Sequence, residues 1–492
     1  MILSTVNHDF RYELEKLCRI FLPFEKIEIT DTPAEGDNTA NTFYKETESG
    51  VMLSAELCCF GQKRKESRMV EKGSENLRDL CELALATCLY DCFCDITGYT
   101  PPWGVLTGVR PAKLYARLCR KEGKKSAENY FSEKLLVSEE KISLCRETHS
   151  LEEKIVNLSR PDSFSLYISI PFCPSRCSYC SFVSHSVEHA KKLIPEYVKL
   201  LCEELKITAE YAKQNNLRLE TVYMGGGTPT TLTHEQMDMV LKTVREHFDL
   251  SHLREWTVEA GRPDTITREK LMVIKNNGVD RISINPQTMN DNVLLAIGRR
   301  HTAKQTEEAF HLARECGFDN INMDLIAGLP TDTCESFEQT LDKVIALAPE
   351  SITVHSLSMK RAATLSTEGE LPPAEIGESA KRMVRSARER ISAAGIKPYY
   401  MYRQSKTVGN LENVGFSLPE KECLYNVYIM DETHTILACG ASAVTKLKEP
   451  NGDYIERIFN YKYPYEYITR FSELMDRKAR INSFYETYRS KN

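Results

Sequence analysis

Residues 166–182 read LYISIPFCPSRCSYCSF, an apolar run followed at once by three cysteines. The run LYISI at 166–170 predicts a short buried β-strand. Cys173, Cys177 and Cys180 come directly after it, with three and then two residues between them. This spacing places three thiols on one short loop at the carboxyl end of a strand.

Three thiolates can hold three corners of a [4Fe-4S] cubane, whereas a closed electron-transfer cluster normally uses four cysteine ligands. One iron is then left open, and it can chelate the amino and carboxylate groups of S-adenosylmethionine (SAM). An electron from the reduced cluster could cleave the carbon–sulfur bond of SAM and release a 5′-deoxyadenosyl radical, which is chemistry of the cofactors. The spacing alone leaves zinc or plain core cysteines open, since short cysteine motifs recur by chance.

The sequence after residue 160 alternates short apolar runs with amphipathic stretches, as βαβ units do. Six runs predict strands: LYISI (166–170), TVYMGG (221–226), WTVEA (256–260), RISINP (281–286), INMDLIAGL (321–329) and SITVHSL (351–357). Polar or glycine residues at their carboxyl ends favour an α/β fold. The expected form is a parallel sheet closing into a partial (β/α)6 TIM-like barrel with its active site at that end. An open doubly wound sheet is the structural alternative.

The rest of the chain predicts two further domains. Residues 1–158 combine short extended runs with a helical stretch around 72–95, which indicates an α+β domain to which no motif gives a role. Residues 159–375 form the predicted barrel. Residues 376–492 open with an amphipathic helix and continue with strand-like pieces, which indicates a small C-terminal α+β domain.

The composition excludes several classes of protein. The chain has 492 residues, 41% of them hydrophobic, so it can bury a large core. Its formal net charge is −6 with both signs interspersed, so we do not expect nucleic acid as a partner. The N-terminal residues lack the pattern of a signal peptide, and no apolar run is long enough to span a bilayer. We therefore expect a cytoplasmic protein with no membrane partner.

The chain contains seventeen cysteines, scattered along its length. Most are expected to be small buried hydrophobes rather than members of a disulfide framework. Cys58 and Cys59 are adjacent, and Cys88, Cys92 and Cys94 lie close together. No histidine or further cysteine pair completes a recognisable metal-binding set around them, so we expect no second metal site here.

A glycine triplet follows the second predicted strand. Gly225, Gly226 and Gly227 precede Thr228 and Pro229. Missing side chains let the backbone approach a ligand and offer its N–H and C=O groups to the methionyl end of SAM. The alternative is that the triplet only makes a turn.

Polar residues lie at the ends of the following strands. Glu259 ends the third strand, Gln287 follows the fourth and Asp324 lies in the fifth. A buried carboxylate costs free energy unless it is paired or hydrogen-bonded, which favours a ligand role. The alternative is a structural ion pair with Arg281 or Arg299.

Taken together, YISIPFC with its following cysteines, MGGGTPT, VEAGRPD, GVDRISINPQ, IGRRHT and NMDLIAGLP occur in a familiar order. They resemble the oxygen-independent coproporphyrinogen III dehydrogenases and their relatives, the HemN/HemW/HemZ group of radical SAM proteins. This resemblance covers about residues 160–375. Outside it, TGVRPAKL, PYYMYRQ, GNLENVGF and ECLYNVYIMDE look like the HemZ-type branch, which is similar over the full length.

The resemblance implies site residues position by position. The ligands of the [4Fe-4S] cluster are matched by Cys173, Cys177 and Cys180. Positions that contact SAM are matched by Tyr167, Gly226, Glu259, Gln287, Arg299 and Asp324. Further SAM contacts, where the HemN-like pattern has a second SAM, are matched by Tyr179, Gly227 and Thr228.

The resemblance also implies a reaction, the oxidative decarboxylation of two propionate side chains of coproporphyrinogen III to vinyl groups, giving protoporphyrinogen IX. The radical would abstract a hydrogen from the propionate β-carbon, CO2 would leave, and an acceptor would take the surplus electron. The expected electron donor is reduced flavodoxin or ferredoxin, and the expected state is a monomer. Arg299 and Arg262 are candidates for holding propionates through bidentate contacts, although a solvated surface position is favoured for Arg262.

Two residues depart from the HemN-like pattern beside the cluster: Ser169 stands in place of a histidine, and Phe182 in place of an extra cysteine. A haem chaperone of the HemW type is therefore an alternative function. That branch carries an HNxxYW motif, of which residues 425–430 here retain only the asparagine. A third possibility is radical methylation and ring opening of haem.

Overall fold

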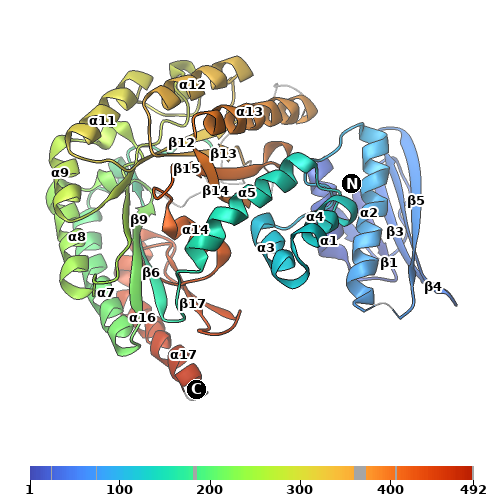
Figure 1. The fold of residues 1–492 in the computed structure, drawn as a ribbon, viewed down its shortest axis with the longest axis horizontal. Helices are drawn as coiled ribbons and strands as arrows, with labels where there is room; N and C mark the ends of the chain where they lie inside the picture. The colour runs from blue at the N-terminus through green and yellow to red at the C-terminus, as the bar shows by residue number, and fades with distance from the viewer. Residues whose placement is uncertain (24, 74, 181–184, 359–372, 405–406, 490–492) are drawn as a thin grey trace. The chain divides into compact units, whose positions relative to one another are not determined.

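The computed structural model describes residues 1–492 apart from 24, 74, 181–184, 359–372, 405–406 and 490–492 (Figure 1). Phe182 thus lies outside the described residues. The chain divides into two compact units. Unit 1 comprises Met1–Arg146 and Tyr402–Glu412, and unit 2 comprises Glu147–Met401 and Asn413–Asn492. The division into domains at 1–158, 159–375 and 376–492 stays a prediction.

Unit 1 is built on a five-stranded sheet of order β2-β1-β3-β4-β5. Its strands are β1 (Ile2–Val6), β2 (Glu28–Thr30), β3 (Thr39–Glu46), β4 (Gly50–Cys59) and β5 (Gln62–Glu71). Its helices are α1 (Arg11–Phe21), α2 (Leu77–Thr97), α3 (Pro111–Glu122), α4 (Lys124–Asn129) and the first part of α5 (Glu139–Val156). Burial alternates along β4 with the period of two that a half-buried strand requires. The unit is therefore α+β.

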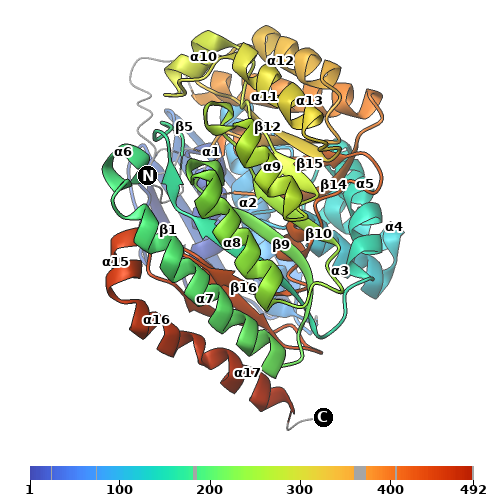
Figure 2. The same ribbon diagram turned by 90° about the vertical axis from the view of Figure 1, so that its left-hand side faces the viewer.

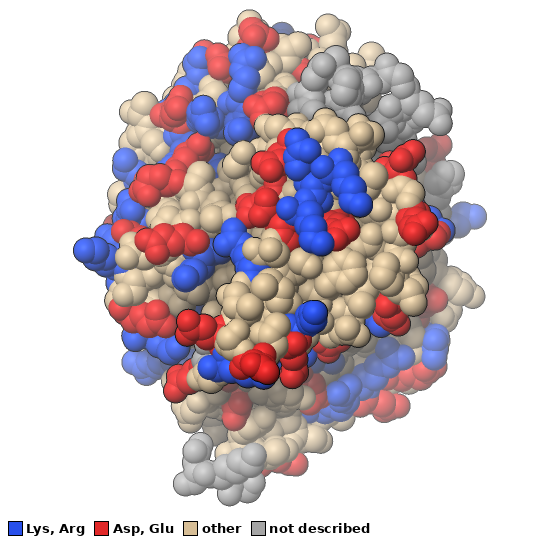
Figure 3. Space-filling view, turned by 90° about the vertical axis from the view of Figure 1, so that its right-hand side faces the viewer, with Lys and Arg blue, Asp and Glu red and all other residues tan. Residues whose placement is uncertain are grey.

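The outer strand of this sheet, β5, is exposed along almost its whole length and rich in charge. Lys65 pairs with Glu56 of the neighbouring strand, and Arg68 pairs with Asp91 of α2. Figure 3 shows groups of basic side chains beside acidic ones on the side of the molecule that it views. Charges at an edge strand oppose pairing with further strands.

Unit 2 contains six neighbouring parallel strands in the order of the sequence. They are β6 (Ser163–Ile170), β9 (Arg218–Gly226), β10 (Glu255–Glu259), β11 (Arg281–Ser283), β12 (Ile321–Ala327) and β13 (Ser351–Ser356). The intervening helices, which cover the outer face of the sheet in Figures 1 and 2, are α7 (Ile194–Gln214), α8 (His234–His247), α9 (Arg268–Asn276), α10 (Asp291–Ala296), α11 (Ala303–Glu315) and α12 (Cys334–Ala346). In a doubly wound sheet the strand order reverses at a point within the sheet, whereas here the six strands follow one another in sequence order. The prediction of a partial (β/α)6 barrel is therefore confirmed.

The strands after residue 375 extend both edges of this same sheet. Beside β13 lie β15 (Glu412–Ser417), which is antiparallel to it, and then β14 (Lys397–Arg403). Beside β6 lie β16 (Thr435–Cys439), which is parallel to it, then β17 (Val444–Lys448) and β18 (Ile455–Phe459). The helix predicted after residue 375 is present as α13 (Pro373–Ala393). The sheet therefore has eleven strands among the described residues.

The remaining helices of unit 2 pack differently. α15 (Pro464–Thr469), α16 (Phe471–Lys478) and α17 (Arg480–Arg489) lie against α7, as Figure 2 shows. α14 (Leu424–Asp431) packs against β9 and places Tyr425 in a ring stack with Tyr167 and Tyr223. Of the helices in the described residues, none is both long and apolar enough to cross a membrane.

Candidate active site

The three cysteines lie on the loop that follows β6. Cys173 ends the short strand β7 (Phe172–Cys173), which pairs with β8 (His185–Ser186). The amide of Cys180 donates to the carbonyl oxygen of Cys177 at 3.1 Å and closes a turn. All three are half-buried thiols outside any disulfide. The structure thus places the three predicted cluster ligands on one loop at the carboxyl end of the first barrel strand.

Thr228 and Arg262 donate hydrogen bonds to two of these sulfurs, and Arg299 also interacts with Cys177. Thr228 Oγ1 lies 3.5 Å from Cys173 Sγ, and Arg262 Nη1 lies 3.7 Å from Cys177 Sγ. Donors aimed at sulfur suit thiolate ligands, so the residues present fit a [4Fe-4S] cluster. Among the described residues, no three His, Cys, Asp or Glu side chains converge as a single metal ion would need. A cubane does not require this, because each thiolate binds a different iron.

The glycine triplet runs directly beside the cysteine loop. The amide of Gly227 donates to the carbonyl oxygen of Ile170, and that of Thr228 to the carbonyl oxygen of Phe172, both at 2.7 Å. A Cβ on Gly227 would lie 2.6 Å from the Phe172 oxygen, and Gly226 has a φ of +103°. Only glycine allows both the approach and this backbone conformation. The triplet is therefore more than a turn.

Glu259 ends β10 at the same edge of the sheet. Burial raises the pKa of its carboxyl group to about 7; the hydroxyl group of Tyr223, which donates to it, opposes this rise, and the charge of Asp324 adds to it. Among the described residues, no ion pair joins Glu259 to Arg281 or Arg299. Arg281 instead donates to Ser351. Since one protein donor leaves most of the acceptor capacity of a carboxylate unused, Glu259 is suited to bind a ligand.

Asp324 in β12 and Gln287 in the segment after β11 lie side by side. Asp324 Oδ1 accepts a hydrogen bond from Asn322 at 2.6 Å, and its Oδ2 lies 3.8 Å from His355 Nε2. Burial alone would raise the pKa of Asp324, but these partners outweigh burial and lower the pKa. Gln287 has a φ of +68° and donates its amide to the Asp324 carbonyl oxygen. A strained non-glycine residue at the mouth of a barrel is typical of a functional site.

His355 is a further residue at this mouth that was not predicted from the sequence. It lies in β13, within the predicted strand SITVHSL, and is half-buried beside Asp324. Its signal was the one used for the other strands, a polar residue inside an apolar run near the carboxyl end. His355 therefore joins the candidate residues at the mouth.

Tyr179 and Arg299 form one group. Arg299 is buried, and its Nη2 donates to the Tyr179 hydroxyl at 3.0 Å while its Nη1 donates to the carbonyl oxygen of Asn285 at 2.9 Å. Burial raises the pKa of Tyr179, so the phenol stays protonated at neutral pH. Arg299 thus ties the cysteine loop to the segment after β11.

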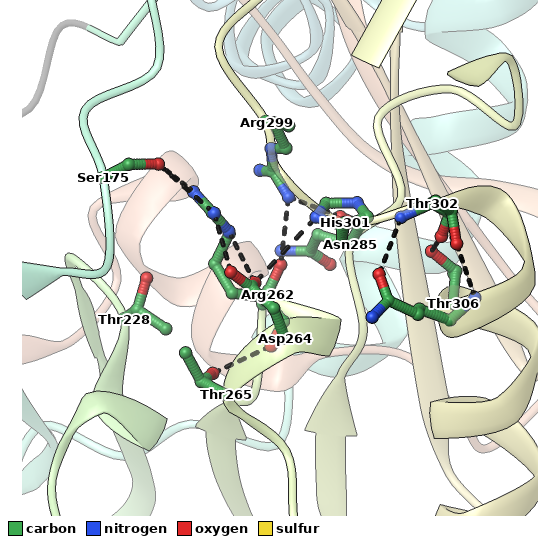
Figure 4. Close-up of polar contacts among 12 residues, drawn as sticks. Ser175, Thr228, Arg262, Asp264, Thr265, Asn285, Arg299, His301, Thr302 and Thr306 are labelled. Carbon is green, nitrogen blue, oxygen red and sulfur yellow. Dashed lines mark hydrogen bonds and ion pairs between the residues drawn. The ribbon is translucent and has the colours of Figure 1, made fainter. Parts of the chain in front are cut away.

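The expectation of a solvated surface position for Arg262 is wrong. Its side chain is only 4% exposed, and it donates through Nε and Nη2 to both oxygens of Asp264 at 3.0 Å. Both of its Nη atoms also lie 3.3 Å from Ser175 Oγ, on the cysteine loop (Figure 4). Each nitrogen of the guanidinium donates to a protein atom, so we no longer assign it to a propionate.

Ser169, the departure in β6, is buried and turned toward protein. Its hydroxyl donates to the carbonyl oxygen of Ala441 at 2.8 Å, and its own carbonyl oxygen accepts from the Tyr197 hydroxyl at 2.8 Å. The side chain is thus part of the link between β6 and the segment after β16.

Comparison with known proteins defines the class. Residues 167–344 match the model of the radical SAM superfamily. Membership of this superfamily implies a [4Fe-4S] cluster and SAM as cofactors. The crystallised HemN from Escherichia coli, a coproporphyrinogen III oxidase, has the same fold with a TM-score of 0.51 at 23% identity, over 67% of this chain and 73% of its own.

The chain is 41% identical over 388 residues to the oxygen-independent coproporphyrinogen-III oxidase-like protein HemZ of Bacillus subtilis, covering 78% of this chain and 77% of that protein. It is 40% identical over 197 residues to the haem chaperone HemW of the same organism, which is 39% of this chain and half of that protein. The chain therefore belongs to the HemZ-like family of oxygen-independent coproporphyrinogen-III oxidase-like proteins.

Proposed function

We propose that this protein is a radical SAM enzyme that oxidatively decarboxylates coproporphyrinogen III to protoporphyrinogen IX. The observation that carries the proposal is the meeting of the cysteine loop with Thr228 and Arg262, which donate to two of its three sulfurs. The extent of the similarity to HemZ also supports it, because that match includes sequence on both sides of the barrel strands.

The proposed roles follow the positions of the residues. The cluster would be held by Cys173, Cys177 and Cys180. SAM would be contacted by Tyr167, Gly226, Glu259, Gln287, Arg299 and Asp324, and a second SAM by Tyr179, Gly227 and Thr228. When bound, these cofactors supply a 5′-deoxyadenosyl radical.

The chain's own groups would bind and orient. Gly226 and Gly227 let the backbone after β9 pack directly against the start of the cysteine loop, where a side chain would collide with Phe172 or lie against Ser169. Glu259 and Asp324 offer carboxylate oxygens to hydroxyl or amino groups of a ligand. Tyr425 stacks on Tyr223, and a tetrapyrrole would bind at the carboxyl ends of the strands, beside the cysteine loop.

We further propose that a reduced flavodoxin or ferredoxin supplies the electrons, and that the protein acts as a cytoplasmic monomer. The electron donor is proposed from the similarity to the oxygen-independent coproporphyrinogen-III oxidase-like protein HemZ, because the proposed radical chemistry needs an external source of electrons.

A haem chaperone is the second candidate, because HemW relatives reach 40% identity over part of the chain. The counterpart of the HemW motif lies in α14, where Tyr425 and Tyr428 are buried. Tyr428 stacks on His434 and donates to the carbonyl oxygen of Ile155. Side chains so engaged are poorly placed to bind haem, which favours the enzyme.

The test is anaerobic reconstitution with iron and sulfide, followed by mass analysis of reactions with SAM, reductant and coproporphyrinogen III. We expect two of the four propionates each to lose CO2 and two hydrogens as 5′-deoxyadenosine forms. The matched control is Cys177→Ala, which should lose both the decarboxylation and the formation of 5′-deoxyadenosine. Unchanged coproporphyrinogen with tight stoichiometric haem binding would favour the chaperone. Methyl transfer and a linear tetrapyrrole would favour haem opening.

A further inference from the structure

We propose that Arg262 is a positioning residue that raises the reduction potential of the cluster by donating a hydrogen bond to Cys177 Sγ. The inference rests on the proposed function only in that Cys177 must bind the cluster; it does not depend on the tetrapyrrole. It assigns to the Arg-Pro-Asp segment after β10 a role that the SAM-contact positions do not include.

The geometry places Arg262 between the cysteine loop and an anchor. Toward the loop it donates to Cys177 Sγ at 3.7 Å and to Ser175 Oγ at 3.3 Å. Away from the loop it forms the two-pronged contact with Asp264, which lies in the 3₁₀-helix Pro263–Thr265 (Figure 4). Because a forked contact fixes the plane of a guanidinium, Nη1 is held toward the sulfur.

The anchor is itself held in the charged form. Burial alone would raise the pKa of Asp264, but the hydrogen bonds and charge of Arg262 outweigh burial and lower the pKa. His301 lies beside the pair, with Nδ1 3.9 Å from Asp264, and burial with the charges of Arg299 and Arg262 lowers its pKa to about 4. His301 is therefore neutral at neutral pH and adds no third positive charge beside Arg262 and Arg299.

The electrostatic consequence has a definite sign. Reduction adds one negative charge to a cluster, and a cationic donor at a ligand sulfur stabilises that charge. Arg262 is almost fully buried, so solvent screens its charge little. Thr228 donates to Cys173 as well, but as a neutral hydroxyl, and neutral donors are weaker. We therefore assign a larger effect on the potential to Arg262 than to Thr228; Arg299, a second buried cation that interacts with Cys177, is present in every variant tested.

A higher potential has a functional consequence. It makes the transfer of one electron from the donor protein to the cluster more favourable. It also lowers the driving force for passing that electron to SAM. Arg262 would thus set the balance between reduction and SAM cleavage.

The test is a redox titration followed by electron paramagnetic resonance on the full-length reconstituted protein, without SAM or tetrapyrrole. Arg262→Met should keep the wild-type iron and sulfide content. Its midpoint should become more negative by about a tenfold change in the one-electron equilibrium constant, which is ~59 mV. Arg262→Lys keeps the charge and should shift less in the same direction. The matched control is Arg245→Met, which removes an exposed cation from the last turn of α8 and should leave the midpoint unchanged.

Resonance Raman spectra give a second readout that net charge alone would not move. Loss of the hydrogen bond should shift the iron–thiolate stretching bands in both Arg262 variants and not in the control. Should Arg262→Met fail to assemble a cluster, Arg262→Lys decides by the same two measurements. A fully loaded Arg262 variant with the wild-type midpoint and bands would overturn the inference.

The two proposals can fail separately. A wild-type cluster whose potential responds to Arg262, in a protein that leaves coproporphyrinogen III unchanged, would refute the proposed reaction and support this inference. Wild-type iron content in Cys177→Ala would overturn the cluster assignment and this inference with it.

Discussion

Two carboxylates of unit 2, Glu204 and Glu259, show how a structural site differs from a binding site. Glu204 lies in α7 and is fully buried. Its two oxygens accept four hydrogen bonds, from the amide of Gly440, the side-chain amide of Asn460, the hydroxyl of Tyr467 and the ammonium of Lys478. Glu259 accepts from the hydroxyl of Tyr223, and its pKa is raised to about 7.

The difference lies in what remains to be bonded. A carboxylate with both oxygens saturated has no capacity for a ligand, so Glu204 joins α7 to the segments after β16. Glu259 has spare acceptor capacity and is destabilised as an anion by burial. A hydrogen-bond donor on a ligand would stabilise the Glu259 carboxylate, which the protein alone stabilises poorly. Spare capacity, rather than burial, therefore marks the functional carboxylate.

The largest effect is expected when the saturated site is broken. Lys478→Met leaves the charge of Glu204 buried without its cation, which typically costs about 3–5 kcal/mol of unfolding free energy. The measurement is urea unfolding followed by tryptophan fluorescence. The matched control is Arg480→Met, which removes an exposed cation paired with Glu456 and should leave the midpoint almost unchanged. Equal shifts in the two variants would contradict a structural role for the Glu204 network.

A smaller, pH-dependent effect is expected at Glu259. Its pKa rises from 4.5 to about 7 on folding, so the folded protein binds the proton more tightly than the unfolded chain. Unfolding free energy should therefore fall as pH rises between about 4.5 and about 7, by up to about 3 kcal/mol. Glu259→Gln should abolish this dependence in the SAM-free protein and also weaken SAM binding. Glu315→Gln, at an exposed position, is the control; an identical pH profile in both variants would argue against the raised pKa.

The smallest effects compare two tyrosines. Tyr467→Phe removes a donor from the charged Glu204 and should cost about 1.5–3 kcal/mol at any pH near neutrality. Tyr223→Phe removes the donor to Glu259 and should cost less than about 1 kcal/mol at pH 5, where that carboxyl group is protonated. Tyr223→Phe should also raise the pKa of Glu259 further, because the hydroxyl group opposes the rise. The unfolding free energy should then keep falling to a higher pH than in the wild-type protein. Unfolding curves of both variants at pH 5 and pH 8 measure these losses. Equal losses of unfolding free energy in the two variants at both pH values would contradict the difference between Glu204 and Glu259.

The sequence by itself determined the barrel and the position of the cysteine loop. Strand period, strand spacing and the C-x3-C-x2-C pattern are local properties, and each of the six predicted runs contains or overlaps one of the parallel strands. The close backbone approach at the glycine triplet could also be predicted, because it depends only on the absence of side chains.

Only the tertiary structure decided the environment of each side chain. Arg262 and Cys177 are separated by 85 positions, and they meet because the carboxyl ends of parallel strands share one edge of the sheet. The five later strands extend both edges of the barrel sheet. This placement could not be predicted from the sequence, because no local pattern states which edge a strand will join. The raised pKa of Glu259 and the saturation of Glu204 likewise depend on neighbours distant in the sequence, since burial and donor count are set by packing.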